Sequence, residues 1–62
     1  MQVLRYREVA ERVHYTPVHI RRLIKSGDFP KPIKLGGRLV VFDSAEIEKW
    51  LQAKADDRAV SN

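Results

Sequence analysis

Apolar residues fall at helical spacing in two adjacent segments near the N-terminus. The first stripe comprises Val9, Ala10 and Val13, and the second comprises Ile20, Leu23 and Ile24. Each set lies on one face of a helix, which predicts helices over residues 7–13 and 17–26. Only His14 and Tyr15 lie between the first helix and the capping residue of the second. A break this short makes two helices cross steeply, so the pattern predicts a helix-turn-helix.

The second helix has clear boundaries in the sequence. Thr16 is a suitable N-cap, and Pro17 falls at the first helical position, where its missing N–H costs nothing. Gly27 is expected to end the helix, because glycine adopts the left-handed backbone conformation that commonly follows a last turn. The segment Phe29-Pro30-Lys31-Pro32 then excludes regular helix.

Beyond the prolines the pattern changes to strand spacing. Two short strands, residues 33–35 and 38–42, flank Gly36-Gly37, which predicts a β-hairpin on a two-residue glycine turn. The inward face is expected to comprise Ile33, Leu35, Val40 and Phe42. Leu39 and Val41 would then face outward, either as ordinary surface residues or as a contact between protomers. We favour the protomer contact.

A third helix follows the hairpin. Asp43 and Glu46 have the spacing of a capping box, and Trp50 is expected to be the largest residue of the core. Residues 56–62 are polar and small, which predicts a disordered C-terminal tail after a domain of residues 1–55. The fold class is therefore α+β, a small winged helix-turn-helix of three helices with a two-stranded β-hairpin wing.

Length and composition limit the protein to one small domain. The 62 residues are too few for a second core, and the absence of cysteine excludes disulfides and thiolate metal sites. No segment resembles a signal peptide, and no apolar run is long enough to cross a bilayer. We expect a soluble cytoplasmic protein with no membrane partner and no small-molecule ligand.

The charge is concentrated in the middle of the chain. Residues 16–38 hold six basic residues and one acidic residue, a net +5, whereas the whole chain is +4. Such a polarised basic segment favours a polyanionic partner, and its setting in a helix-turn-helix favours double-stranded DNA. The residues expected to contact DNA from the second helix are Thr16, Pro17, Val18, His19, Arg21, Arg22 and Lys25. Those expected to contact DNA from the wing are Lys34, Gly36, Gly37 and Arg38.

Catalysis and metal binding have little support. No histidine is spaced to activate Thr16 or a serine, and no carboxylate pair is bracketed by apolar residues. His14 and His19 are five residues apart with no third ligand nearby, so no metal site is expected. We predict no catalytic residues, no enzyme activity and no cofactor.

The residues so far described resemble a known family. The run TPVHIRRLIKSGDFPKPIKLGGR, followed by VVFDSAEIEKWL, is similar to the AlpA and excisionase (Xis) group of small phage-type, MerR-like winged-helix proteins. The resemblance covers about residues 4–51. It implies that Arg22 is the recognition-helix arginine and Arg38 the wing arginine. In this chain His14 replaces the glycine common in the turn, which predicts a left-handed conformation there, and Tyr6 replaces the usual small polar cap.

The resemblance implies a DNA-binding and DNA-bending protein that loads as several copies on attachment-site repeats. Its function would be that of an excisionase, which directs a tyrosine or serine integrase towards excision in the nucleoid of a bacterial host. An AlpA-type transcriptional regulator without a role in recombination is an alternative. A winged-helix module that binds protein is an alternative of another class.

Overall fold

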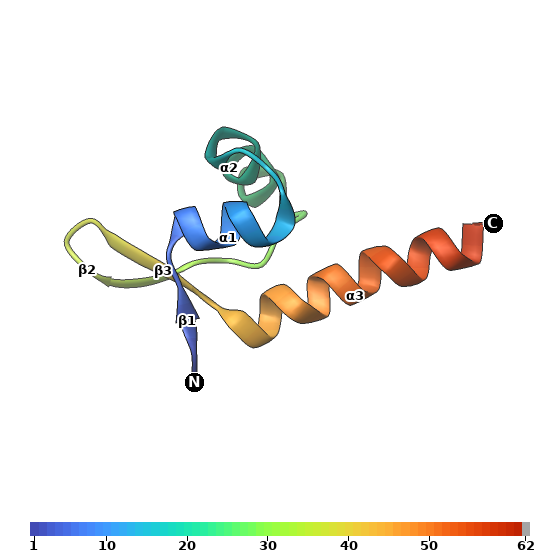
Figure 1. The fold of residues 1–62 in the computed structure, drawn as a ribbon. Coiled ribbons are helices and arrows are strands. Elements are labelled where there is room, and N and C mark those ends of the chain that lie inside the picture. The colour runs from blue at the N-terminus through green and yellow to red at the C-terminus, as the bar shows by residue number, and fades with distance from the viewer. Residues whose placement is uncertain (62) are drawn as a thin grey trace.

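The computed structural model describes the backbone of residues 1–61 and the side chains of residues 1–57. Its elements are β1 (Val3–Leu4), α1 (Tyr6–Val13), α2 (Pro17–Ser26), β2 (Ile33–Gly36), β3 (Leu39–Asp43) and α3 (Ser44–Ser61). The helices α1 and α2 lie together beside the sheet, the β2–β3 hairpin projects at one end, and α3 leads away at the other (Figure 1). The predicted α+β winged helix-turn-helix is confirmed.

The sheet has three antiparallel strands in the order β1-β3-β2. Strand β1 was not predicted, because two residues are too few for an alternating pattern to be visible in the sequence. Val3 pairs with Asp43 and Leu4 with Phe42, so the N-terminal end of the chain is joined to the strand that precedes α3. The backbone N–H of Ser44 also donates to the carbonyl of Gln2 at 3.0 Å, which extends this junction to the start of α3.

The core lies between α1, α2, the sheet and the first turns of α3. Its buried side chains are Val9, Val13, Ile20, Phe29, Phe42 and Ile47. The largest fully buried side chain is Phe42, so the expectation that Trp50 fills this role is wrong. Trp50 is only partly buried, because its indole Nε1–H donates to the carbonyl of Asp28 at 2.9 Å at the margin of the core.

The helix boundaries follow the local signals closely. The Thr16 Oγ1 accepts a hydrogen bond from the His19 N–H at 3.2 Å, and Gly27 ends α2 with φ at +84°. His14 is left-handed, with φ at +61°, as its position in the turn predicts. Helix α1 begins one residue earlier than expected, at Tyr6, because the Glu8 carboxylate accepts the Arg5 N–H at 2.9 Å and satisfies that backbone donor.

The hairpin turn lies one residue further along the chain than predicted. Gly36 pairs with Leu39 as the last residue of β2, so the turn is Gly37-Arg38 and not Gly36-Gly37. An irregularity between Lys34 and Gly36 shifts the register, and Ile33 consequently lies opposite Val41. A shift of one residue exchanges the two faces of a strand. The predicted inward face is therefore partly wrong.

Burial differs from the prediction at two positions. Val41 is buried at 3% exposure, whereas Leu35, which was expected to face inward, is 58% exposed. Phe42 keeps its predicted inward position at 0% exposure. Gly36-Gly37 and Gly37-Arg38 each contain a glycine, which tolerates positive φ. The sequence alone therefore did not distinguish the two possible turns.

Helix α3 continues to Ser61, across most of the range 56–62 that composition had assigned to a disordered tail. The helix-favouring residues Gln52, Ala53, Lys54 and Ala55 precede this range. The Gln52 side-chain amide also donates to the Asp56 carboxylate at 3.0 Å, one helical turn later. Asn62 lies outside the described residues.

Replacing Gly27 with alanine should lower the free energy of unfolding by about 1 kcal/mol, and the Tm by roughly 4–8 °C. A Cβ at Gly27 would meet no atom within 4 Å, so the cost would come from the positive φ and not from a clash. Gly27→Asn is the matched control, because asparagine tolerates the left-handed conformation better than alanine. Thermal unfolding followed by circular dichroism measures the difference, and equal Tm values for the two variants would contradict this explanation.

Candidate nucleic-acid interface

The outer face of α2 and its N-cap, Thr16, carry all the residues predicted for a recognition helix. Each of these is exposed in the structure: Thr16, Pro17, Val18, His19, Arg21, Arg22 and Lys25. The opposite face is anchored by Ile20, which is 0% exposed, with Leu23 and Ile24 packed beside it. Because the burial of one stripe fixes the rotation of a helix about its axis, the polar face of α2 is presented to solvent.

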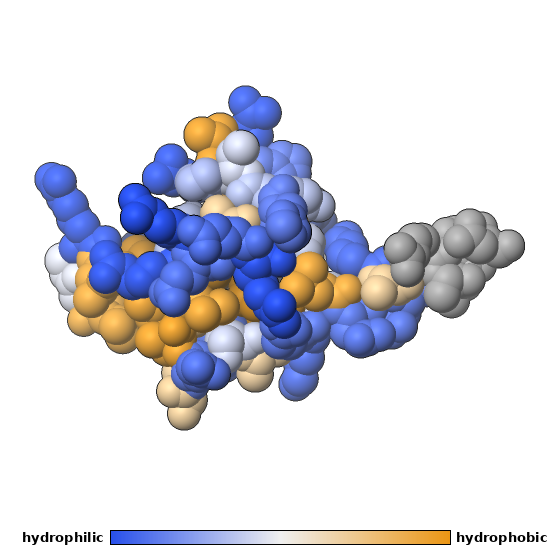
Figure 2. All heavy atoms as spheres, in the orientation of Figure 1, coloured by the Kyte–Doolittle hydropathy of each residue, from blue (hydrophilic) through white to orange (hydrophobic). Residues whose placement is uncertain are grey.

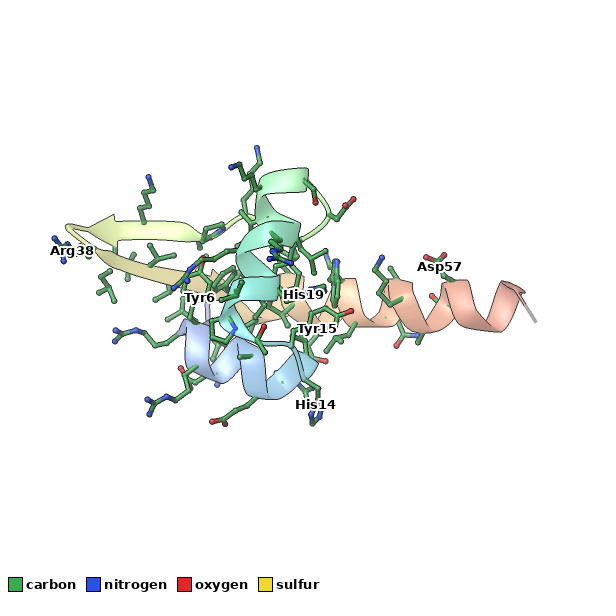
Figure 3. The ribbon with its side chains drawn as sticks, turned by 90° about the horizontal axis from the view of Figure 1, so that it is seen from above. Tyr6, His14, Tyr15, His19, Arg38 and Asp57 are labelled. Atoms are coloured by element: carbon green, nitrogen blue, oxygen red, sulfur yellow. The ribbon has the colours of Figure 1, made fainter. Side chains whose placement is uncertain are left out.

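Contacts with aromatic rings flank this face of α2 on both sides. On one side the His19 ring packs edge-on against Tyr15, with 4.5 Å between the ring centroids. On the other side the Arg21 guanidinium lies 5.5 Å from the centre of the Tyr6 ring, which is a cation–π contact. In Figure 3, Tyr6 lies towards the wing, whereas Tyr15 and His19 lie towards α3. Arg22 lies between the two sides on the helix.

The wing residues predicted to contact DNA are likewise exposed: Lys34, Gly36, Gly37 and Arg38. Arg38 occupies the turn itself and therefore lies at the tip of the hairpin (Figure 3). Gly36 and Gly37 both have positive φ, at +139° and +53°, conformations that side chains disfavour. The tip thus combines backbone without side chains and one guanidinium group.

The predicted protomer contact requires a correction. Leu39 is 38% exposed, but Val41 is buried under its own domain and offers almost no surface to a partner. The exposed apolar residues of the three strands are Val3, Leu35 and Leu39, which we call the apolar sheet face. Hydrophobic residues gather over the hairpin in Figure 2.

A hollow of about 560 Å³ lies where α1 begins, between α2 and the wing. It brings together two predicted residues, Arg21 and Arg38, with two that the sequence analysis missed, Arg5 and Arg7. The sequence contained a signal for the second pair. Arg5 and Arg7 flank Tyr6 closely, but the glutamates further along residues 1–15 reduce the net charge of that segment to +1.

Other classes of site are not seen in the described part of the chain. Among the residues that the structure describes, no three His, Asp or Glu side chains are grouped as ligands for a metal ion. Within the same residues, no helix has the length and apolar character needed to cross a membrane.

Comparison with known proteins gives one match, at the level of family. No curated protein matches the chain, and no solved structure matches it. The family described as prophage CP4-57 regulatory protein (AlpA) matches residues 2–55, which is most of the chain and includes α2, the wing and the first turns of α3. The chain therefore belongs to the AlpA family of prophage regulatory proteins, a family of DNA-binding regulators.

Proposed function

We propose that this protein binds specific sites on double-stranded DNA as several adjacent copies, bends the DNA, and thereby acts as an excisionase-type accessory factor. In this proposal α2 enters the major groove and the wing contacts the neighbouring backbone. The proposal rests on one observation, that α2 and the wing lie beside the same hollow. The arginine-bearing face of α2 and the tip of the wing border the same hollow, through Arg21 and Arg38. One duplex can therefore contact both.

The chemistry of α2 suits the major groove. Arg22 lies on the outward face and is free to approach base edges, where an arginine forms paired hydrogen bonds with guanine O6 and N7. The Thr16 oxygen accepts the His19 N–H, and its own hydroxyl proton remains available to a phosphate at the start of the helix. The wing would add contacts from Lys34, Arg38 and the bare backbone of Gly36 and Gly37 to the phosphates or the minor groove.

Cooperative binding follows from the size of the domain. A single module of this kind buries roughly 600–1,000 Å² on DNA, which is little for tight specific binding. Contacts between neighbouring copies would supply the missing affinity. The apolar sheet face is the surface that we assign to this contact, because Leu35 and Leu39 are exposed at 58% and 38% beside the proposed DNA surface.

A promoter-binding regulator without a role in recombination is the second candidate. The description of the family as regulatory proteins favours it. Both functions use the same helix and wing, so they differ in the position of the sites on the DNA and in whether an integrase takes part. An integrase gene beside the gene for this protein would favour the excisionase.

Arg22→Ala should weaken binding to the preferred site by about 1–3 kcal/mol and relax the base preference, because it removes a contact to a base. Lys34→Ala is the matched comparison, since it should weaken binding to all sequences alike by removing a phosphate contact. Mobility-shift titrations against a panel of duplexes with single base-pair changes measure both effects. If Arg22→Ala lowers affinity equally for every duplex, Arg22 does not contact bases.

DNA affinity should fall steeply with salt. If about five phosphates are neutralised, a plot of log K against log salt concentration should have a slope near −4.5, because each contact releases condensed counterions. Fluorescence anisotropy on a labelled duplex between 50 and 200 mM salt gives the slope. A slope near zero would contradict electrostatic binding, and no binding at low salt would favour a module that binds protein.

The double variant Leu35→Ser/Leu39→Ser should occupy a single site but lose cooperative loading on adjacent sites. Both side chains are exposed, Leu39 less than Leu35, so their replacement should leave the fold intact. Footprinting across a candidate attachment site shows the number and phase of protected repeats. If the variant protects all repeats at the same protein concentration as the wild type, the apolar sheet face is not the contact between neighbouring copies.

A further inference from the structure

The hollow at the start of α1 has an unusual concentration of positive charge. Its charged lining residues are Arg5, Arg7, Arg21, Arg38 and Glu8, and the Tyr6 ring forms part of its wall. Four arginines and one glutamate therefore line a hollow of about 560 Å³. We call this hollow the arginine cleft.

The positive charge of the cleft is not neutralised by ion pairs with the described residues. Among the described residues the ion pair joins Arg12 to Glu48, which do not line the cleft, and no cleft arginine has a carboxylate partner. The Glu8 carboxylate is engaged in part, because it accepts the Arg5 backbone N–H at 2.9 Å. Like charges held in one concavity repel each other and attract counterions, so an anion in the cleft would relieve an existing cost.

One of the four arginines is already positioned. The Arg21 guanidinium lies over the Tyr6 ring at 5.5 Å, and Tyr6 in turn packs edge-on against the buried Phe42 ring at 5.1 Å. A side chain that is held before binding loses less conformational entropy when its partner arrives. Arg21 therefore differs from Arg22: it is directed to the cleft wall, whereas Arg22 lies on the central line of the exposed helix face.

The lining also indicates the class of occupant. Sites for small organic ligands are lined mainly by apolar and aromatic side chains, with few polar groups. Here four of the seven lining residues are arginines, and the planar arrangement of donors in a guanidinium matches phosphate oxygens in pairs. The cleft also lies between α2 and the wing, the two elements assigned to DNA.

We propose that the arginine cleft holds consecutive phosphates of one DNA strand, through Arg5, Arg7 and Arg21, beside the bases contacted by Arg22. This inference rests on the proposed function. It adds the start of α1 to the DNA-binding surface and assigns Arg21 to the phosphate backbone.

The double variant Arg5→Gln/Arg7→Gln tests the cleft directly. The loss of two phosphate contacts should reduce the slope of log K against log salt by about 1.8. Wild-type protein should then lose about twelve-fold more affinity than the variant between 50 and 200 mM salt. The weakening should be the same for specific and non-specific duplexes, because phosphates carry no sequence information.

Two further variants test whether a change in DNA binding comes from the cleft, and not from the net charge of the protein or from unfolding. Lys49→Gln/Lys54→Gln removes the same amount of charge from α3, outside the cleft, and should change the slope far less. Glu8→Gln keeps an oxygen that accepts the Arg5 N–H but removes the negative charge from the cleft, so DNA binding should become tighter. A gain in affinity cannot result from unfolding, and circular dichroism checks that each variant is folded.

The outcomes distinguish this inference from the proposed function. If wild-type protein binds duplex DNA and depends on Arg22, but the Arg5/Arg7 and Lys49/Lys54 variants behave alike, the cleft assignment is wrong and the function stands. If wild-type protein binds no duplex, the function itself fails. NMR titration provides a second check, since duplex DNA should shift the amide signals of residues 5–8. Saturable shifts of the same amides by inorganic phosphate alone, at matched ionic strength, would identify a free-anion site and overturn the assignment to a DNA strand.

Discussion

The Phe42 ring joins the elements of this small domain. Tyr6 of α1 packs edge-on against it at 5.1 Å, and Phe29 packs edge-on at 6.0 Å from the loop after α2. Phe29 in turn contacts Trp50 of α3 at 4.8 Å. Edge-on ring pairs contribute about 0.5–1.5 kcal/mol beyond their buried area. In a chain of 62 residues without cysteine, where small domains usually depend on a covalent or metal cross-link, these contacts are a principal source of stability.

The same ring contacts reach the proposed DNA surface at both ends. Trp50 continues to Tyr15 at 6.1 Å and from there to His19, on one side of α2. At the other end Tyr6 holds Arg21. All five aromatic residues of the chain belong to this one series. The orientation of α2 is therefore fixed from both sides by the packing that also stabilises the fold. The surface ion pair between Arg12 and Glu48 adds little by comparison, because both side chains are about half exposed.

Features encoded by single residues were predictable from the sequence, whereas features set by pairing between distant segments were not. Thr16, Pro17 and Gly27 bound α2 through their own backbone chemistry, so its limits and its outward face could be derived locally. The hairpin register could not, because turns at residues 36–37 and 37–38 both place a glycine where positive φ is needed. Strand β1 depends on a partner some 40 residues away, and the arginine cleft depends on three elements that meet only in the folded chain.

The strand order also determines how the sheet meets other molecules. With β3 in the centre, the free hydrogen-bonding edges belong to β1 and β2. The first is two residues long, and the second follows two prolines, carries Lys34 and has an irregular register. Short, charged or irregular edges resist the addition of further strands, which is the first step of cross-β aggregation. The edges of the sheet are therefore poor sites for a further strand, although apolar side chains are exposed beside the wing.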